Sequence, residues 1–335
     1  MQRCLDLAIK GQGQVAPNPM VGCVIVHNDQ IIGKGYHREF GKAHAEVNAI
    51  QSVENPELLK QSVLYVNLEP CSHHGKTPPC ADLIVEKKIP KVVIGSNDPN
   101  PKVAGGGIKK LRAAGVEVIT CVLKNESDFL NRRFITFHTQ HRPYIILKWA
   151  QSQDGFMAPD EPKQLWLTNN ESRKLVHQWR SEEAAILVGR RTMEIDKPLL
   201  TVRLVEGKNP VRITLGREFI LPFDKKVISA GSPLWIFNEK IESYGDNALQ
   251  YLKLDFKKNV LPQLLDELYK REIQSIIVEG GPTTLQHFIN ADLWDEARVF
   301  TVPILLKSGK RAPVVAGNVI HEEIVQGDRL LVIRK

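Results

Sequence analysis

The sequence has 335 residues, of which 42% are hydrophobic and 25% are charged, and its formal net charge is +7. This length exceeds that of a typical single domain, so two domains are expected in a globular protein of ordinary composition. No apolar run is long enough to cross a bilayer, and the first residues lack a signal-peptide core, so we expect no membrane association and a cytoplasmic location. The five cysteines, an odd number in a long chain, indicate a reducing compartment and thiols available for metal binding rather than a disulfide framework.

The positive charge alone decides little about the partners of the protein. Lys109, Lys110 and Arg112 are interspersed with apolar residues at helical spacing, which is typical of a solvated helix face. No dense basic run with interleaved aromatic residues is present, so nucleic-acid binding is not expected.

The first half alternates strand-like and helix-like segments. In chain order the pattern predicts a helix over 3–10, a strand over 21–27, its hairpin partner over 30–37, a helix over 43–52, a strand over 63–68, a helix over 81–88, a strand over 91–95, a helix over 108–114, a strand over 116–122 and a helix over 126–140. Near-continuous apolar strands separated by helices predict a buried sheet covered by crossover helices.

A second α/β series begins after His141-Arg142-Pro143, which breaks the last helix, so we predict domains over 1–142 and 143–335. In chain order the second series comprises a strand over 144–150, a helix over 171–180, strands over 184–188, 211–215 and 234–237, a helix over 260–270, a strand over 275–278, a helix over 285–289 and a strand over 297–305. The fold class predicted for both halves is therefore α/β.

The strongest chemical signal in the chain is His44-Ala45-Glu46 followed by Cys71 and Cys80. One imidazole and two thiolates give zinc three protein ligands and leave a fourth position for water, as in catalytic zinc sites. Glu46 is close enough in sequence to take a proton from that water and pass it to a departing amine. The pattern is that of zinc nucleobase deaminases, although their two cysteines are closer together. The alternative interpretation is two buried cysteines and an unrelated histidine.

The segment between the two cysteines, residues 72–79, has two interpretations. It is either a loop whose turns are set by Gly75 and two prolines, or an anion-binding segment in which His73, Lys76 and Thr77 hold a phosphate. His74 remains an alternative to His73, as a contact or as a ligand.

Four segments together resemble the bifunctional riboflavin-biosynthesis deaminase/reductase family. They are APNPMVGCV at 16–24, HAE at 44–46, LEPCSHHGKTPPC at 68–80 and DPNP at 98–101. The resemblance covers nearly the entire chain and is stronger in the first 150 residues. It implies an N-terminal cytidine-deaminase-like domain and a C-terminal dihydrofolate-reductase-like domain.

The resemblance also implies roles for residues of the first half. It implies that His44, Cys71 and Cys80 hold one Zn²⁺ and that Glu46 shuttles protons. The residues implied to surround a phosphorylated diaminopyrimidinone are Asn18, His73, Lys76, Thr77, Asp98 and Asn100. For Asn18 and Asn100 the alternative is local turn chemistry, because Asn-Pro pairs start turns by themselves.

The second half lacks a Gly-x-Gly-x-x-Gly fingerprint, and its only phosphate-binding candidate is VEGGPTT at 278–284, between a strand and a helix. Glycines allow a phosphate to approach the backbone, and a helix N-terminus offers free N–H groups. The family uses NADPH in this half to reduce a ribosyl group to a ribityl chain.

The matching segments are LKWAQSQDG at 147–155, WLT at 166–168, RS at 180–181 and LLTVR at 199–203. Through them the resemblance implies that NADPH contacts Ala150, Trp166, Thr192, Asp196, Gly281, Pro282, Thr283 and Thr284. It implies that substrate contacts Gln164, Arg180, Leu200, Arg203 and Glu279. The alternatives are a core position for Trp166 and a surface position for Arg180.

The chain departs from the family pattern at three places in this half. Lys197 stands where the family usually has Asp, and Gln164 stands where it has a short polar residue. Gly216-Arg217 stands where it favours Asp followed by Ser or Thr. The last change removes a small hydroxyl and adds a cation suited to the 2′-phosphate of NADPH, so the sequence leaves both loss and substitution of a contact open.

These observations predict a bifunctional, homo-oligomeric enzyme with Zn²⁺ and NADPH, a small phosphorylated pyrimidine as substrate, and no nucleic-acid or membrane partner. One rival is a base deaminase that acts on nucleic acid and carries a non-catalytic second domain. The other rival keeps the deaminase and makes the second half a structural or dimerisation module.

Overall fold

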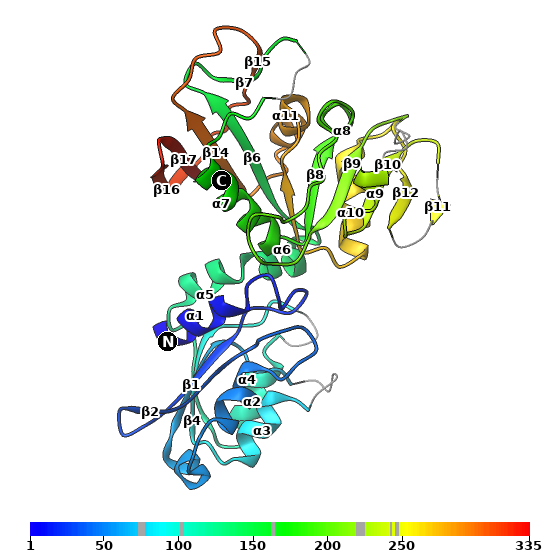
Figure 1. Ribbon diagram of the computed structural model, residues 1–335. Helices are drawn as coiled ribbons and strands as arrows, with labels where there is room; N and C mark the ends of the chain where they lie inside the picture. Colours follow the sequence, from blue (N-terminus) through cyan, green and yellow to red (C-terminus); the bar gives the residue numbers. More distant parts are fainter. Residues whose placement is uncertain (73–77, 101–103, 162–164, 219–224, 242, 245–247) are drawn as a thin grey trace. The chain divides into compact units, whose positions relative to one another are not determined.

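The computed structural model describes residues 1–72, 78–100, 104–161, 165–218, 225–241, 243–244 and 248–335. The chain divides into two compact units, Met1–His141 and Arg142–Lys335 (Figure 1). Each unit has its own sheet and its own hydrophobic core. Among the helices in the described ranges, none is both long and apolar enough to cross a bilayer.

Unit 1 is built on a mixed sheet with the strand order β2-β1-β3-β4-β5, in which β1 pairs antiparallel with β2 and β3 and the remaining pairs are parallel. Its elements are α1 (Gln2–Ala8), a 3₁₀ helix (Ile9–Gly11), β1 (Gly22–His27), β2 (Gln30–Tyr36), α2 (Ala45–Gln51), a 3₁₀ helix (Pro56–Gln61), β3 (Val63–Leu68), α3 (Cys80–Glu86), β4 (Lys91–Ser96), α4 (Gly106–Ala113), β5 (Glu117–Ile119), α5 (Lys124–Leu130) and α6 (Arg132–Gln140).

Both faces of this sheet are covered, as its apolar strands predict. Along β1, Cys23 and Ile25 belong to the core that α2, α3 and α4 complete, whereas Val24 packs with Cys4 and Leu7 of α1. Successive residues of a strand point to opposite faces, so one short strand contributes to two cores. Figure 1 shows α2, α3 and α4 on one side of the sheet and α1 and α5 on the other.

Unit 2 is built on a larger sheet with the strand order β11-β12-β10-β9-β8-β13-β6-β14-β17-β16 and a small sheet of β15 and β7. Its elements are β6 (Tyr144–Ser152), β7 (Phe156–Ala158), α7 (Asn170–Glu182), β8 (Ala185–Gly189), α8 (Arg190–Asp196), β9 (Val211–Leu215), α9 (Lys225–Ile228), β10 (Leu234–Asn238), β11 (Ser243–Tyr244), β12 (Leu249–Lys253), α10 (Val260–Lys270), β13 (Ser275–Val278), α11 (Pro282–Asn290), β14 (Glu296–Val302), β15 (Lys310–Arg311), β16 (Asn318–Val325) and β17 (Asp328–Arg334).

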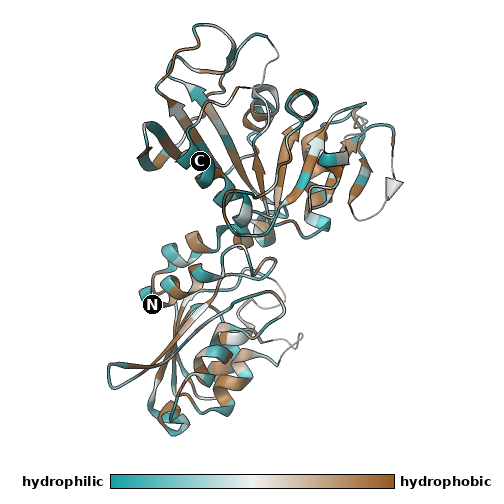
Figure 2. Ribbon diagram, viewed as in Figure 1, coloured by the Kyte–Doolittle hydropathy of each residue, from teal (hydrophilic) through white to brown (hydrophobic). Residues whose placement is uncertain are grey.

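The seven neighbouring strands β12-β10-β9-β8-β13-β6-β14 are parallel to one another. At one end of the sheet β11 pairs antiparallel with β12, and at the other end β17 and β16 continue the sheet through antiparallel pairs. Leu147 and Trp149 of β6 face a core with α10 and α11, and Ile146 faces a second core with α7 and α8. The central strands of both sheets are accordingly mostly brown in Figure 2. Parallel strands bring their carboxyl ends to one edge of a sheet, where α/β proteins bind ligands.

Several predicted elements differ in extent from the structure; the strand predicted over 116–122, for example, is β5 over Glu117–Ile119. Two of the differences have a visible cause. The helix predicted over 126–140 is divided into α5 and α6 at Asn131, whose side chain exchanges hydrogen bonds of 2.8 and 3.0 Å with the backbone N–H and carbonyl of Met20. The strand predicted over 297–305 ends at Val302 because Pro303, which follows it, has no N–H to donate.

Candidate active sites

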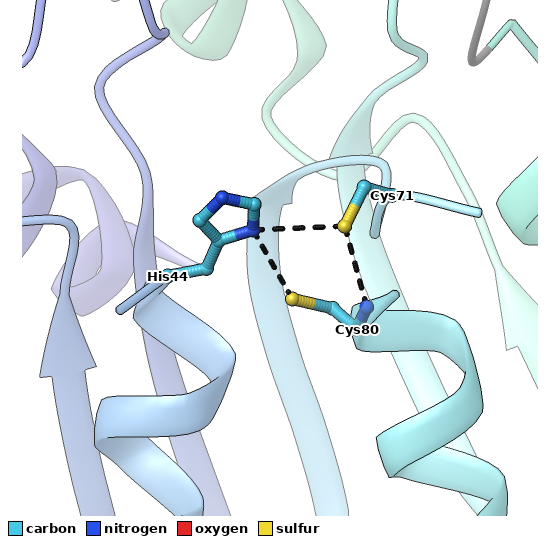
Figure 3. A group of neighbouring side chains, drawn as sticks. All are labelled: His44, Cys71 and Cys80. Carbon is cyan, nitrogen blue, oxygen red and sulfur yellow. Dashed lines mark hydrogen bonds between the residues drawn. The ribbon is translucent and has the colours of Figure 1, made fainter. Parts of the chain in front are cut away.

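The predicted zinc ligands of unit 1 come together from three separate elements. His44 directly precedes α2, Cys71 follows β3, and Cys80 is the first residue of α3 (Figure 3). His44 Nδ1 lies 3.6 Å from Cys71 Sγ and 3.3 Å from Cys80 Sγ. The three ligand atoms all lie within 4.8 Å of one another.

These distances fit a tetrahedral zinc site. Zn–S bonds of about 2.3 Å and Zn–N bonds of about 2.0 Å place the nitrogen and sulfur atoms about 3.6 Å apart in that geometry. The backbone N–H of Cys80 also donates to Cys71 Sγ over 3.3 Å. The side-chain hydrogen bond with the Cys80 thiol lowers the pKa of the Cys71 thiol most, and the His44 ring and the Cys80 backbone N–H add to the effect. The thiolate is the form that binds metal. The residues present therefore suit zinc, with three protein ligands.

Glu46 lies in the first turn of α2 and is buried, with 3% of its surface exposed. Burial raises the pKa of this carboxyl to about 7, and the negative charge of Cys71 adds to the effect. A carboxyl group with a pKa near neutrality can accept and return a proton, which is what a general acid–base catalyst requires.

Asn18 is connected to the metal-ligand cluster through a histidine. Its side-chain nitrogen lies 3.1 Å from His37 Nε2, and the His37 ring packs edge-on against the ring of His44 with centroids 5.4 Å apart. His37 Nδ1 lies 3.1 Å from the carbonyl of Ala43, which orients the ring. Asn18 is thus connected to the cluster through His37.

Asp98 and Asn100 follow β4 in a loop that a buried carboxylate organises. Glu69 accepts hydrogen bonds from the backbone N–H groups of Asp98 (3.2 Å), Gly105 (3.1 Å) and Ile108 (3.2 Å). Asp98 itself accepts from the N–H of Asn100 over 2.8 Å, and burial raises the pKa of Asp98 to about 6. The loop is therefore attached to the segment that leads into Cys71.

Four predicted site residues, His73, Lys76, Thr77 and Gln164, lie outside the described residues.

One buried charged cluster of unit 2 is centred on Glu279, directly after β13. Arg180 of α7 donates to both of its carboxylate oxygens, over 2.8 and 2.7 Å, and Lys148 Nζ of β6 lies 3.9 Å away. Burial alone would raise the pKa of Glu279, but Arg180 and Lys148 outweigh it and hold the pKa at about 2. Arg180 is buried rather than at the surface, with 12% of its side chain exposed.

Arg203 and Leu200 belong to the same neighbourhood. Arg203 Nη1 donates to Thr201 Oγ1 over 2.8 Å, and both Arg203 and Arg180 donate to the Thr201 carbonyl over 3.4 Å. Leu200 is buried beside Thr201 in a left-handed backbone conformation, with φ of 56°. His177 Nδ1 accepts from the backbone N–H of Arg203 over 2.9 Å. Arg180 and Lys148 flank the Glu279 carboxylate, and Arg203 shares the Thr201 carbonyl with Arg180, so the cations outnumber the carboxylate, a balance suited to an anionic substrate.

A cavity of about 1080 Å³ lies at the carboxyl ends of β8, β9 and β13. The predicted site residues that line it are Thr192, Asp196, Glu279, Gly281, Pro282, Thr283 and Thr284. Its size suits a dinucleotide, and the start of α11 offers backbone N–H groups to a pyrophosphate. Among its described lining residues, Ala150 and Trp166 do not occur. Trp166 is 61% exposed, with the Arg173 guanidinium 5.4 Å from its ring centre, so it is not a core residue.

Comparison with known protein families gives matches in both units. Residues 143–325 match the RibD C-terminal domain, and residues 1–96 match the cytidine and deoxycytidylate deaminase zinc-binding region. This chain belongs to the RibD family of riboflavin biosynthesis proteins.

Individual relatives of the RibD family are similar over almost the full length. The chain is 43% identical to riboflavin biosynthesis protein RibD of Aquifex aeolicus, over 92% of this chain and 87% of the relative. It is 35% identical to the protein of the same name from Escherichia coli strain K12, over 93% and 89%.

Solved structures agree. A crystal structure of a diaminohydroxyphosphoribosylaminopyrimidine deaminase/5-amino-6-(5-phosphoribosylamino)uracil reductase from Thermotoga maritima superposes with a TM-score of 0.91 at 37% identity, and covers 100% of this chain and 97% of that one. RibD from Acinetobacter baumannii also gives a TM-score of 0.91, at 31% identity and with 99% and 97% coverage.

Membership of the RibD family confirms the predicted fold class and function. The chain is a bifunctional deaminase and reductase of riboflavin biosynthesis, and its two domains fit Zn²⁺ and NADPH. The rival interpretation, a nucleic-acid deaminase with a non-catalytic second domain, is not favoured, because the second half matches the RibD C-terminal domain.

Three residues near the two sites are not identified by the sequence patterns. His37, Glu69 and Lys148 act through neighbours in space, namely His44, the loop after β4, and Glu279. The sequence does carry a signal for Lys148 and Glu69, because each is a charged residue in or directly after an otherwise apolar strand, where a charge is unusual. His37 carries no such signal.

Proposed function

We propose that unit 1 hydrolyses the 2-amino group of a 2,5-diamino-6-(5-phosphoribosylamino)pyrimidin-4-one, and that unit 2 then reduces the ribosyl group of the product to a ribityl chain. The names of the Thermotoga maritima relative support this choice of substrates. The observation that carries the proposal is the buried Glu46 beside a ligand set for zinc in unit 1. Unit 2 of the same chain adds a cluster of cations next to a cavity large enough for a dinucleotide.

In the deaminase step, we assign His44, Cys71 and Cys80 to the metal and Glu46 to the proton transfers. Zinc, when bound, supplies Lewis-acid activation of water near neutral pH. Glu46 takes the proton from the attacking water at its carboxylate and delivers it to the departing amine, which leaves as ammonia. The residues assigned to the substrate are Asn18, His73, Lys76, Thr77, Asp98 and Asn100.

In the reductase step, the charged cluster holds the substrate while the cavity holds the cofactor. NADPH, when bound, supplies the hydride. Arg180 and Arg203 present guanidinium groups that suit a phosphate, and Glu279 fixes Arg180 through a bidentate ion pair. The remaining assignments are Gln164 and Leu200 to the substrate and Ala150, Trp166, Thr192, Asp196 and residues 281–284 to NADPH.

The experiment that tests this function supplies the diaminopyrimidinone phosphate with and without NADPH and identifies the products by mass. Without NADPH we expect ammonia and the deaminated product alone. With NADPH we expect a product that has also gained two hydrogen atoms, together with oxidised cofactor. Failure of NADPH oxidation with the deaminated intermediate would favour a structural role for unit 2. Zinc retained at wild-type affinity by Cys80→Ser would refute the ligand set.

We further propose that the partner set is limited to small molecules and a second copy of this chain, in the cytoplasm. The described thiols support a reducing compartment, since Cys4, Cys23, Cys71, Cys80 and Cys121 are all free. Real nucleic-acid binding weakens steeply with salt, so retention on immobilised DNA or RNA that falls steeply as salt rises would contradict the absence of a nucleic-acid partner.

A further inference from the structure

The strand order distinguishes the two ends of the cavity of unit 2. The cluster of Glu279, Arg180 and Lys148 lies at β13 and β6, on one side of the cavity. The strand order then runs through β8 to β9, so Gly216, directly after β9, lies toward the opposite side. Under the proposed function, on which this inference rests, the reacting ring of NADPH faces the substrate cluster. Its adenosine half therefore extends toward β9.

The middle of the cavity is formed by closely packed backbone. A β-carbon built on Gly189, at the end of β8, would lie 2.3 Å from Thr284 Oγ1, and one built on Gly281 would lie 3.2 Å from Thr192 Oγ1. The start of α11 therefore abuts the junction of β8 and α8. A pyrophosphate held by the N–H groups of α11 fits between the two ends.

Beyond this junction, Arg190 occupies the space that the missing side chain of Gly216 would need. A β-carbon on Gly216 would lie 2.8, 3.0 and 3.2 Å from Cβ, Cδ and Cγ of Arg190. Real β-carbons essentially never come as close to another atom as the 2.8 Å separation from Arg190 Cβ, so the stem of Arg190 rests directly on the glycine backbone. Arg190 and Lys258 both line the cavity. The Arg190 guanidinium lies 3.6 Å from Glu194, and 54% of the side chain is exposed. The group can therefore reach a ligand.

Arg217, the cation that replaces the usual small hydroxyl, is directed elsewhere. Its Nη2 donates to the carbonyl of Phe256 over 3.0 Å, and its Nε lies 3.5 Å from Glu239. The described residues that line the cavity do not include it. The sequence departure at Gly216-Arg217 thus acts through the glycine, which makes room for Arg190.

We propose that Arg190, resting on Gly216 and accompanied by Lys258, binds the 2′-phosphate of NADPH and sets the preference of this enzyme for NADPH over NADH. A guanidinium binds phosphate through two parallel hydrogen bonds, and NADH lacks this phosphate. The discrimination is therefore electrostatic and weakens as salt is raised.

The test compares Arg190→Ala with Arg217→Ala in the full-length enzyme. Calorimetric titration with NADPH and with NADH measures the affinity of each variant for each dinucleotide. For Arg190→Ala we expect NADPH affinity to fall about tenfold to a hundredfold, the cost of one charged hydrogen-bonding partner, with NADH affinity unchanged. Arg217→Ala should keep both affinities. Adenosine 2′,5′-bisphosphate and AMP, used as competitors, should reproduce the difference without the nicotinamide end.

Gly216→Asp is an independent variant, because its side chain would displace Arg190 and add a negative charge. We expect it to lose NADPH preference as Arg190→Ala does. The assignment would be overturned if Arg190→Ala lowered the affinities for NADPH and NADH equally. It would also be overturned if Arg217→Ala, rather than Arg190→Ala, abolished the preference for NADPH. If the wild-type enzyme binds neither dinucleotide, the proposed reductase function itself fails. If the wild-type enzyme binds both dinucleotides equally well, only the proposed role of Arg190 fails.

Discussion

Glu46 combines a buried carboxyl group, a pKa raised to about 7 by burial, and a position two residues after a zinc ligand. We expect Glu46→Gln to lower the rate of ammonia release by about 10²- to 10⁴-fold, because the amide cannot shuttle a proton. The zinc content should remain that of the wild type, since Glu46 is not needed as a ligand. Ammonia release at undiminished rate would refute the proton-shuttle role. Glu39→Gln, an exposed carboxylate of the same unit, is the matched control and should be neutral.

His177 gives unit 2 a predictable dependence of stability on pH. Burial, followed by the charges of Arg180 and Arg203, lowers its pKa from 6.5 to about 4. Between these values the unfolded chain binds a proton that the folded chain excludes, so the contribution of His177 to stability is present above pH 6.5 and is lost as the pH falls toward 4. Protonation also removes the acceptor for the backbone N–H of Arg203. Urea unfolding between pH 7 and pH 4 should show this decline.

The variant that isolates the effect is His177→Asn, whose side-chain oxygen can accept the same hydrogen bond without titrating. We expect its free energy of unfolding to decline less than that of the wild type over this range. Parallel pH curves for the two proteins would show that His177 does not carry the effect.

At the residue scale, the sequence identifies side chains whose chemistry is local and misses those that act across the fold. His44, Cys71 and Cys80 are recognisable because ligand type, order and the adjacent Glu46 agree with one mechanism. Lys148 is separated from Glu279 by 131 positions, and nothing in the sequence connects them before the parallel pairing of β6 and β13 is known.

Glu69 joins two elements of unit 1, because its carboxylate accepts two backbone N–H groups from the loop after β4 and one from the first turn of α4. Gly107 completes the junction, since a β-carbon there would lie 2.0 Å from the carbonyl of Pro70. We expect Glu69→Ala to destabilise unit 1 by about 2–4 kcal/mol, because the buried donors lose their acceptor. We also expect the KM for deamination to rise more than kcat falls, because Asp98 and Asn100 lose their positions.

The control for this variant is Glu57→Ala, which removes an exposed carboxylate paired with Lys60 and should change unfolding by less than about 0.5 kcal/mol. Glu69→Gln keeps one acceptor oxygen and should recover part of the stability. A Glu69→Ala enzyme with normal KM and normal thermal unfolding would contradict the positioning role.

At the element scale, the apolar patterns predict most central strands and helices, and several bounds agree with the structure. The ranges 63–68, 211–215, 260–270 and 275–278 are those of β3, β9, α10 and β13. The helix break at Asn131 was not predictable, because it depends on a partner, Met20, that is distant in sequence. The strands β16 and β17 are not among the predicted elements; β16 shows little strand pattern because it is exposed and mixes polar with apolar residues.

At the scale of the whole molecule, each unit has its own sheet, and the residues proposed for each activity all belong to a single unit. We therefore expect residues 1–141 and 142–335, produced as separate proteins, to retain deamination and NADPH-dependent reduction respectively. Two assays on the separate fragments, each compared with the full chain, measure this. Loss of one activity in a fragment that still unfolds cooperatively would mean that the active site needs the other unit.

The edge of the larger sheet carries the prediction about assembly. β16 is paired with β17 on one side, and its other side has no partner strand among the described residues. Its apolar side chains Val319, Ile320 and Ile324 are 55%, 44% and 62% exposed. Long edge strands with exposed apolar residues are usually covered, and two identical strands can pair antiparallel about a twofold axis. We expect Ile324→Lys to reduce the assembly toward the single-chain mass in sedimentation or light-scattering measurements.

The matched control is Ile9→Lys, which places the same charge at a 48% exposed isoleucine of unit 1 and should leave the mass unchanged. Ammonia release by Ile324→Lys should also be unchanged, because the variant lies in unit 2 and the deaminase residues lie in unit 1. A wild-type protein that sediments as a single chain at micromolar concentration would refute the homo-oligomer. If Ile324→Lys left the mass of the assembly unchanged, β16 would not lie at the interface. A lysine on an edge strand buried between two copies could not keep its charge solvated, so it would weaken such an interface.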